Sequence, residues 1–223
     1  MPNLAILGYG KMGRLIDHLA PEYGFSVTAR IDVDRNESLV GADVAVEFST
    51  PSAVLGNIEK LASLRIPAVI GTTGWQEHLD AAKAIVQKNG AALVWSPNFS
   101  VGVNIFSRLV SEAARLFAKE KEYGAWAWEI HHITKKDAPS GTLLKLVDEM
   151  KRAGFDRPID ASANRAGAHP GTHEIGFDSA ADTITLRHTA RSREGFARGA
   201  LKAAQWIIGR QGFYEFSDVL FGG

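Results

Sequence analysis

The sequence predicts an α/β protein with a Rossmann-type parallel sheet domain and a second α+β domain whose sheet is mixed or antiparallel. Its first apolar run leads directly into a G-x-G-x-x-G at residues 8–13, and a helical pattern follows. Strand and helix patterns then alternate as far as about residue 100, which is typical of a parallel sheet with helices on both faces. The later strand-like runs 172–177 and 183–188 have no helix between them, so we expect them to pair antiparallel.

Composition restricts the class of protein. The 25 Lys and Arg residues balance 25 Asp and Glu residues, so nothing indicates the basic surface that is typical of nucleic-acid binding. The absence of cysteine excludes disulfides, thiolate metal sites and a cysteine nucleophile. No basic region precedes the short apolar stretch near Met1, so we expect neither a signal peptide nor a membrane helix. We therefore expect a cytoplasmic protein with no nucleic-acid and no membrane partner.

The glycine motif has the context that a dinucleotide-binding loop requires. Residues 4–7 form a short apolar strand, and the helical pattern behind the motif stops at Pro21. In such a loop, Gly8 allows the tight turn and Gly10 lets the backbone approach a pyrophosphate. Gly13 allows the helix to pack closely on the strand.

An acidic residue at the end of the second strand supports this interpretation. Residues 25–31 alternate between apolar and polar side chains, and Asp32 follows them about 20 residues after the glycines. A carboxylate there can accept hydrogen bonds from the adenine-ribose hydroxyls of NAD. The nearby Arg30 and Arg35 complicate the choice between cofactors. We therefore favour NADH and keep NADPH as a second cofactor.

The remaining elements complete two domains. We expect strands at 44–48, 68–70, 92–95 and 125–132, and helices at 51–63, 76–88, 103–119, 142–153 and 198–208. Phe48 and the Gly-Thr-Thr-Gly loop at residues 71–74 follow strands of the first domain, where ligands of parallel sheets bind. We expect the last helix to pack back on the first domain. The sequence therefore predicts a dinucleotide-binding domain of residues 1–102 and 197–223, and a substrate-binding and oligomerisation domain of residues 103–196.

A polar cluster, EIHHITKKDAPSGT at residues 129–142, stands where a strand ends and a helix begins. Backbone N–H groups at a helix start are unpaired and attract anions, and the cluster adds lysines and histidines. An anion site beside a group that titrates near neutral pH is a candidate active site. On a strand from residue 125, His131 and His132 point to opposite faces unless the strand has already ended. Only one of them can then easily be the proton donor, and the pattern does not say which.

These residues resemble the 4-hydroxy-tetrahydrodipicolinate reductase (dihydrodipicolinate reductase) family of diaminopimelate and lysine biosynthesis. The main shared motif is Glu129-x-His131-His132-x-x-Lys135-x-Asp137-Ala138-Pro139-Ser140-Gly141-Thr142. Supporting motifs are Gly71-Thr72-Thr73-Gly74, Asn98-Phe99-Ser100-x-Gly102-x-Asn104, Arg165-Ala166-Gly167 and His188-x-Ala190-x-Ser192-Arg193. The resemblance implies a Rossmann domain plus a mixed-sheet domain that builds a homotetramer in many members.

The resemblance also implies a reaction and a set of site residues. The reaction is hydride transfer from NADH or NADPH to a cyclic imine dicarboxylate, with His131 as the general acid. Lys135 would hold a substrate carboxylate and assist proton transfer. The substrate carboxylates would be bound by His132, Ser140, Gly141, Thr142 and Thr73. The cofactor would be bound by Gly8, Gly10, Lys11, Met12, Gly13, Asp32, Phe48, Gly71 and Thr73. No metal is proposed, although His169 and His173 have the spacing of a zinc pair.

The sequence leaves two other hypotheses about the function open. An amino-acid dehydrogenase of similar architecture would keep residues 8–13 but need not have the anion turn at residues 135–142. A nucleotide sensor would need neither a proton donor nor a lysine at the site. The chain also departs from many family members, because only residues 33–44 separate its second and third predicted strands. This short connection borders the expected adenine pocket. In the second domain, the sequence assigns no role to Trp126 and Trp128.

Overall fold

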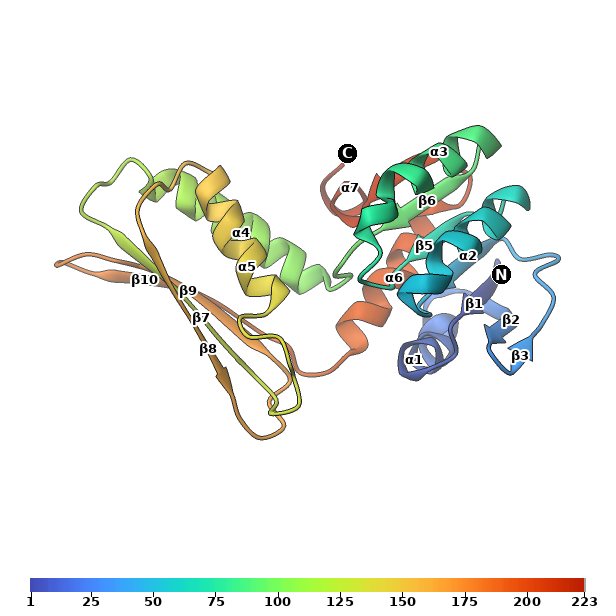
Figure 1. Ribbon diagram of the computed structural model, residues 1–223, viewed down its shortest axis with the longest axis horizontal. Helices are drawn as coiled ribbons and strands as arrows, with labels where there is room; N and C mark the ends of the chain where they lie inside the picture. The colour runs from blue at the N-terminus through green and yellow to red at the C-terminus, as the bar shows by residue number, and fades with distance from the viewer. Residues whose placement is uncertain (223) are drawn as a thin grey trace. The chain divides into compact units, whose positions relative to one another are not determined.

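The computed structural model describes residues 1–222 and divides them into two compact units, shown in Figure 1. Unit 1 consists of residues 1–101 and of the chain from Arg193 onward, whereas unit 2 consists of residues 102–192. Unit 1 therefore comes from two separate pieces of the chain, and unit 2 from one continuous piece.

The sheet of unit 1 is parallel except at one edge, which confirms the Rossmann-type prediction. Its strand order is β11-β6-β5-β4-β1-β2-β3. The bounds are Asn3–Leu7 for β1, Ser26–Asp32 for β2, Arg35–Asn36 for β3, Val44–Glu47 for β4, Ala68–Ile70 for β5, Ala92–Trp95 for β6 and Gly212–Glu215 for β11. The short β3 returns antiparallel along the end of β2. The carboxyl ends of the parallel strands meet at one edge of the sheet, where the glycine motif begins.

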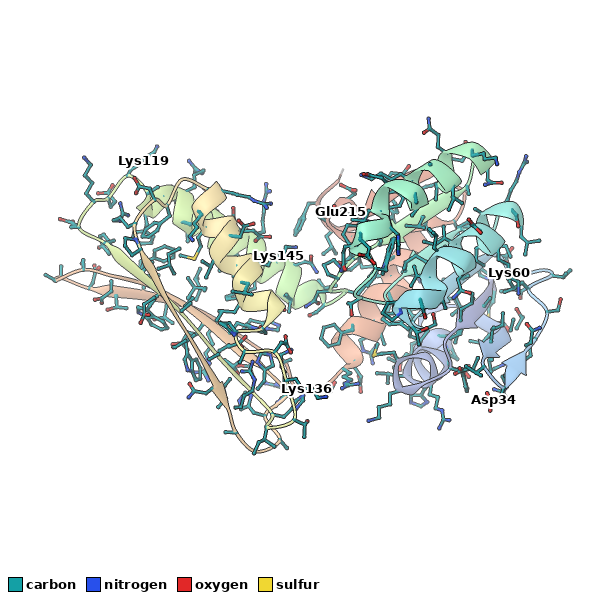
Figure 2. All side chains as sticks on the ribbon, viewed as in Figure 1. Asp34, Lys60, Lys119, Lys136, Lys145 and Glu215 are labelled. Carbon is teal, nitrogen blue, oxygen red and sulfur yellow. The ribbon has the colours of Figure 1, made fainter. Side chains whose placement is uncertain are left out.

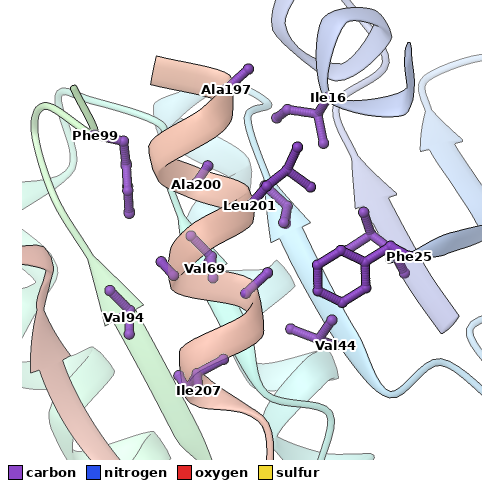
Figure 3. Close-up of a cluster of buried hydrophobic side chains, with 14 of the residues drawn as sticks. Ile16, Phe25, Val44, Val69, Val94, Phe99, Ala197, Ala200, Leu201 and Ile207 are labelled. Atoms are coloured by element: carbon purple, nitrogen blue, oxygen red, sulfur yellow. The ribbon is translucent and has the colours of Figure 1, made fainter. Parts of the chain in front are cut away.

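Helices cover both faces of this sheet. Their bounds are Lys11–Leu19 for α1, Pro51–Ser63 for α2, Leu79–Asn89 for α3, Glu194–Ile207 for α6 and Phe216–Phe221 for α7, and 3-10 turns occur at Ala20–Tyr23 and Gln76–His78. One apolar cluster joins α1 and α6 to the sheet, and another joins α2 and α3 to its other face. Figure 3 shows Ala200 and Leu201 of α6 among side chains of the sheet. The last helix thus packs on the first domain, as the sequence predicts.

Unit 2 is a mixed sheet with helices on one face. The strand order is β10-β9-β7-β8, and the bounds are Gly124–His131 for β7, Ile159–Arg165 for β8, Thr172–Asp178 for β9 and Thr183–Thr189 for β10. β9 pairs antiparallel with β10, as predicted, and with β7, whereas β8 pairs parallel with β7. Helices α4 (Val101–Phe117) and α5 (Gly141–Arg152) bury one face of this sheet in an apolar cluster.

Some elements carry too little pattern to be predicted from the sequence. Strand β8 lies at an edge and is largely exposed, and the apolar residues that alternate in its sequence IDASANR are mostly alanine, which is depleted in strands. Strands β3 and β11 and helix α7 are only a few residues long. Short edge elements are stabilised by their neighbours, so their own sequences give weak signals.

Charged side chains of both signs cover the surface of each unit. Lys60 and Asp34 lie on the surface of unit 1, and Lys119 and Lys145 on that of unit 2 (Figure 2). Within residues 1–222, every helix is too short or too polar to cross a membrane.

Candidate active site

The turn after β1 requires glycine at two positions. Gly8 has φ +88°, and a Cβ atom there would lie 2.2 Å from the carbonyl oxygen of Phe48. A Cβ atom at Gly13 would lie 2.2 Å from the carbonyl oxygen of Gly8, so α1 can approach β1 only without a side chain. At Gly10, by contrast, no described atom lies within 4 Å of the Cβ position. The backbone there is open to a ligand.

Cavities open along this edge of the sheet. One, of about 470 Å³, is lined by Gly10, Lys11, Met12, Phe48, Ser49, Pro51, Gly71, Thr72, Thr73 and Arg193. Another, of about 350 Å³, is lined by Leu7, Gly8, Gly10, Ile31, Asp32, Val33, Phe48, Ser49, Thr50, Ala53 and Asn57. Every residue expected to bind the cofactor lines one of these cavities except Gly13, which packs behind the turn.

Asp32, the last residue of the neighbouring strand β2, holds the glycine turn after β1 in place. Its carboxylate accepts hydrogen bonds of 2.8 Å from the N–H groups of Tyr9 and Val33. Phe48 closes the other side, and a Cβ atom at Gly71 would lie 2.1 Å from the Phe48 ring. An open glycine backbone at a helix start, with an acidic residue at the end of the next strand, fits a dinucleotide.

A buried carboxylate that the sequence did not single out lies beneath these loops. Glu47, at the end of β4, is fully buried. Its Oε1 accepts hydrogen bonds from the hydroxyl and N–H of Ser49 and from Asn57. Burial raises the pKa of Glu47, although these hydrogen bonds oppose the rise. Glu47 therefore fixes the Ser49 loop that lines both cavities.

In unit 2, the two adjacent histidines point to different environments. His131 is buried, with 8% of its surface exposed, and its Nδ1 lies 3.6 Å from Oε2 of Glu129. His132 is partly exposed, and its Nδ1 lies 2.7 Å from the hydroxyl of Thr134. The two histidines thus lie in different surroundings: His132 follows the end of β7, and His131, the last residue of β7, belongs to a polar network.

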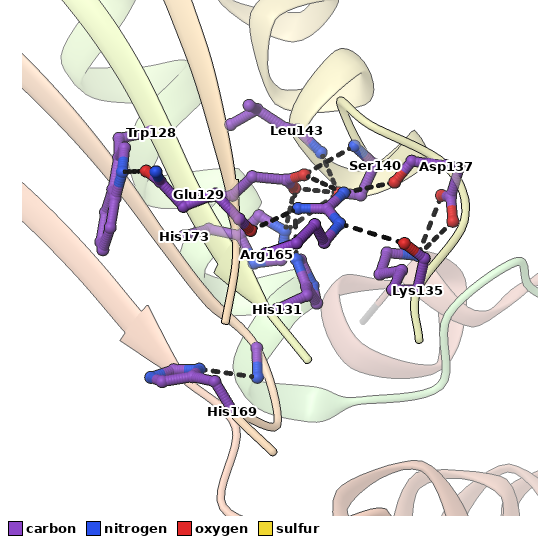
Figure 4. A network of polar contacts seen from close by, with 12 residues as sticks. Trp128, Glu129, His131, Lys135, Asp137, Ser140, Leu143, Arg165, His169 and His173 are labelled. Atoms are coloured by element: carbon purple, nitrogen blue, oxygen red, sulfur yellow. Dashed lines mark hydrogen bonds and ion pairs between the residues drawn. The ribbon is translucent and has the colours of Figure 1, made fainter. Parts of the chain in front are cut away.

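Glu129 is the centre of that network (Figure 4). The carboxylate is fully buried and accepts hydrogen bonds from Ser140, through its N–H at 2.8 Å and through its hydroxyl. Arg165 donates to Oε1 at 2.9 Å, and Nε2 of His173 lies 3.3 Å from Oε2. Strand register brings these side chains together. His173 of β9 is the direct partner of Glu129, and Arg165 of β8 is the direct partner of His131.

Hydrogen bonds favour the charged form of the carboxylate, whereas burial favours the neutral form of the histidines. Burial by itself raises the pKa of Glu129, but hydrogen bonds from Ser140 and Arg165 lower it on balance. Burial lowers the pKa of His131, while the charge of Glu129 opposes this shift. Burial, with the neighbouring His131, lowers the pKa of His173 to about 4.

The loop between β7 and α5 holds the expected anion-binding groups. Lys135 forms hydrogen bonds of 2.8 and 2.9 Å with the Asp137 carboxylate. Ser140 is the N-cap of α5, and its hydroxyl accepts the N–H of Leu143. The N–H and hydroxyl of Ser140 also donate to Glu129. Gly141 and Thr142 are therefore the residues of the first turn of α5 that remain for binding an anion.

A metal is not favoured by these surroundings. Within residues 1–222, the side chains that could hold one together are Glu129, His131 and His173, whose ligand atoms lie within 4.8 Å of one another. The guanidinium of Arg165 already neutralises that carboxylate and would repel a cation. His169, the other half of the possible zinc pair, instead accepts a hydrogen bond from the N–H of Gly171.

Family models match both units of the chain. A model described as "Dihydrodipicolinate reductase, N-terminus" matches residues 2–99, and one described as "Dihydrodipicolinate reductase, C-terminus" matches residues 102–220. The chain belongs to the dihydrodipicolinate reductase family. The resemblance stated from the motifs is thereby confirmed, and the chain is a member of an oxidoreductase family.

Relatives of this reductase family match along nearly the whole chain. The 4-hydroxy-tetrahydrodipicolinate reductase of Christiangramia forsetii is 36% identical over 98% of this chain and 97% of its own. That of Archaeoglobus fulgidus is 33% identical over 95% of this chain and 96% of its own. A dipicolinate-bound dihydrodipicolinate reductase from Paenisporosarcina sp. TG-14 has a TM-score of 0.83 at 21% identity, covers 98% of this chain and 99% of its own, and shows the shared fold.

Sequence reasoning missed several residues of this reductase's site. The motifs contain Glu129 and Arg165 but predict no role for either, and the spacing of His173 indicates only a possible zinc pair with His169. The strand period does indicate that Glu129 is buried, because it shares one face of β7 with Ala127 and His131. A carboxylate on a buried face needs a partner, and the partners come from strands whose register the sequence does not reveal.

Proposed function

We propose that the protein reduces 4-hydroxy-tetrahydrodipicolinate to tetrahydrodipicolinate with NADH or NADPH, in diaminopimelate and lysine biosynthesis. Unit 1 binds the dinucleotide, and unit 2 binds the substrate. Family membership supports the reaction. The observation that carries the mechanism is the buried Glu129 carboxylate, which joins His131 to the anion-binding start of α5.

The substrate carries two carboxylates, so it needs two anchors that fix its orientation. The start of α5 supplies one, through Gly141 and Thr142, with Ser140 as the N-cap that holds the turn in place. Lys135 and His132 supply charge beside it, and Lys135 exchanges Asp137 for the substrate carboxylate. Thr73, in the loop after β5, is a further proposed substrate-binding residue.

His131 is the proposed general acid. Its Nδ1 faces Glu129, so the proton that it donates leaves from Nε2. Gly171, with φ +133°, lies against that nitrogen, since a Cβ atom there would be 3.0 Å from Nε2. The missing side chain keeps space beside the proton donor.

Proton transfer then completes the reduction. Loss of the ring hydroxyl as water leaves a C=C bond conjugated to the imine. When bound, the reduced nicotinamide would supply a hydride to the carbon that carried the hydroxyl, which leaves an enamine-like anion. The imidazolium of His131 protonates the ring carbon next to the reduced one. The pKa of His131 is lowered by burial in the free protein, and a substrate with two negative charges raises it. Protonation of the general acid is therefore coupled to substrate binding. Lys135 assists by holding positive charge beside the developing anion.

Gly8, Gly10, Lys11, Met12, Gly13, Asp32, Phe48, Gly71 and Thr73 form the proposed cofactor site. Asp32 favours NADH, because its carboxylate accepts hydrogen bonds from ribose hydroxyls and repels a 2′-phosphate.

We further propose a homotetramer in the cytoplasm. The face of the unit 2 sheet away from α4 and α5 carries Trp126 and Trp128 around a hollow of about 500 Å³, which Glu174 and Arg187 also line. Aromatic side chains and arginine are enriched at subunit interfaces. Analytical ultracentrifugation tests the assembly, and a monomer at micromolar concentration would contradict it.

The reaction is tested by measuring the oxidation of NADH and NADPH through the change in their absorbance. The substrate is made in situ from pyruvate and aspartate semialdehyde by the preceding synthase. Rapid oxidation that depends on the synthase supports the proposal and ranks the cofactors. A folded protein that binds NADH but oxidises none with this substrate would show that its substrate is another, such as an amino acid, or that it is a sensor.

A further inference from the structure

Lys135 and Asp137 face each other in the loop between β7 and α5, separated by one residue (Figure 4). The ammonium of Lys135 lies 2.8 and 2.9 Å from the two carboxylate oxygens of Asp137, so it contacts both of them. A carboxylate is also the group that the proposed substrate would present to this lysine. In the free protein, the proposed anchor is therefore already occupied by a carboxylate of the same chain.

The Asp137 carboxylate also interacts with the other part of this anchor, the start of α5. Hydrogen bonds from Lys135 lower the pKa of the Asp137 carboxyl, and the backbone N–H of Gly141 adds to this shift, whereas burial opposes it. Gly141 is the first residue of α5, and N–H groups in a first helical turn have no partner within the helix. Asp137 thus interacts with the two groups that are proposed to hold a substrate carboxylate.

The backbone of this loop is held independently of the two side chains. Arg165 donates a hydrogen bond to the backbone carbonyl of Asp137 and another, of 3.3 Å, to that of Lys135. The same guanidinium donates to the buried carboxylate of Glu129 at 2.9 Å. The side chains are freer, because 25% of the Lys135 side chain and 56% of the Asp137 side chain are exposed. Asp137 can therefore turn into solvent while the loop that carries Lys135 keeps its shape.

A tethered carboxylate weakens every anion that uses the same anchor. Asp137 competes at a high effective concentration, because it is only two residues from Lys135. If it fills the anchor about nine-tenths of the time, the apparent affinity of any ligand for that anchor falls about tenfold. Ion pairs between partly exposed side chains are weak, so a ligand can still displace it. A small anion with one contact is then hardly bound, whereas a dicarboxylate keeps its second anchor.

We propose that Asp137 is an internal competitor that occupies the Lys135 anchor until a dicarboxylate displaces it, so that inorganic anions and monocarboxylates do not fill the site. The proposal rests on the proposed function in that Lys135 and the start of α5 bind a substrate carboxylate. It assigns Asp137 a role that opposes binding. An aspartate that only shaped the loop would instead support binding, so the two roles predict effects of opposite sign.

Isothermal titration calorimetry with pyridine-2,6-dicarboxylate measures the sign of this effect without catalysis. This probe is a stable dicarboxylate, and the full chain is titrated with saturating NADH present. We expect Asp137→Asn to bind the probe about tenfold more tightly than the unaltered protein, because the competing charge is removed while the shape of the side chain is kept. Added sodium sulfate should weaken the probe more in this variant than in the unaltered protein, because sulfate can then reach Lys135.

Asp148→Asn is the matched control. Asp148 lies on α5, has 52% of its side chain exposed, and forms an ion pair of 2.7 Å with Arg152. Its substitution removes the same charge from unit 2 at a similar exposure, so it should leave the affinity for the probe nearly unchanged. In a Lys135→Gln background, Asp137→Asn should increase the affinity much less, because the anchor for which Asp137 competes is missing.

The outcomes separate the internal competitor from the reaction. Equal or weaker binding by Asp137→Asn would overturn the proposal, because an aspartate that only shapes the loop gives that result. An equal gain in Asp148→Asn would also overturn it, since only the overall charge would then matter. If neither the unaltered protein nor Asp137→Asn binds the probe, the proposal fails together with the substrate-binding role of unit 2. The expected gain in a protein that does not reduce 4-hydroxy-tetrahydrodipicolinate would keep the competitor and reject only the reaction.

Discussion

Oε2 of Glu129 lies 3.6 Å from Nδ1 of His131, and both side chains are buried. The same carboxylate is held from other directions by Ser140 and Arg165. Glu129 can therefore fix the orientation of the imidazole and favour its charged form, without contacting the substrate itself. Its role in the proposed mechanism is to position His131.

Replacing Glu129 by glutamine should lower the pKa of His131 further. The charge of Glu129 raises that pKa against the effect of burial, and the amide removes the charge while keeping the shape. The pKa of the His131 ring is measured by NMR titration of the substrate-free protein, and turnover by steady-state kinetics. We expect turnover to fall about tenfold or more with a smaller change in KM. Glu112→Gln, at an exposed position of α4, is the control, and an unchanged His131 pKa in Glu129→Gln would refute the positioning role.

Replacing His131 by glutamine should reduce turnover by about 10² to 10⁴, because the ring carbon loses its proton donor. Substrate binding should change much less. The matching variant is His132→Gln, which should act mainly on KM, because His132 lies beyond the end of β7 and is partly exposed. Equal effects of both variants on turnover would assign no special role to the buried histidine.

Replacing Lys135 by glutamine should raise KM for the dicarboxylate by about tenfold or more, because a charge-assisted hydrogen bond to a carboxylate is lost. The adjacent Lys136 is exposed, and the structure shows Lys135 to be the one tied into the loop by Asp137. Lys136→Gln is thus a control of identical charge. If both variants raise KM equally, only the general positive potential of the loop matters.

Acid should destabilise the protein through its buried histidines. The pKa of His173 is about 4 in the folded protein, below the value of about 6.5 expected when it is unfolded. Between these values the unfolded chain binds more protons, so the free energy of unfolding falls as the pH falls from about 6.5 to about 4. His131 and His188, whose pKa values are also lowered by burial, act in the same direction. His173→Gln should make this dependence shallower in urea unfolding at several pH values. An equally steep dependence in the variant would show that His173 titrates normally.

The sequence predicts the site to the extent that local pattern determines it. The strand pattern correctly places His131 on β7, and the helix pattern places α5 directly after the polar cluster, beginning at Gly141 and not at residue 142. The partners of Glu129 could not be found in this way. Arg165 and His173 reach it through the register of β8 and β9 against β7, and register depends on the packing of whole strands.

The same distinction between local pattern and strand register holds for the proposed dinucleotide site of unit 1. The glycines and Asp32 could be identified because their spacing follows from one strand, one turn and one helix. The neighbouring Arg35 depends on a hairpin that is set by a two-residue turn and by pairing at a sheet edge. Composition and periodicity in the 33–44 segment give no sign of that pairing.

The two-piece construction of unit 1 has a consequence for synthesis on the ribosome. Helix α6 buries Ala197, Gly199, Ala200, Leu201, Ala203, Ala204 and Ile207, and most of these side chains join the cluster that contains β1 and β4. The apolar face that this helix covers therefore stays uncovered until nearly the whole chain has been translated. Unit 2 is continuous, so all of its strands and helices emerge earlier. The first domain to begin is thus the last to be completed, and during that interval its exposed sheet face is the part of the nascent chain that most needs protection from aggregation.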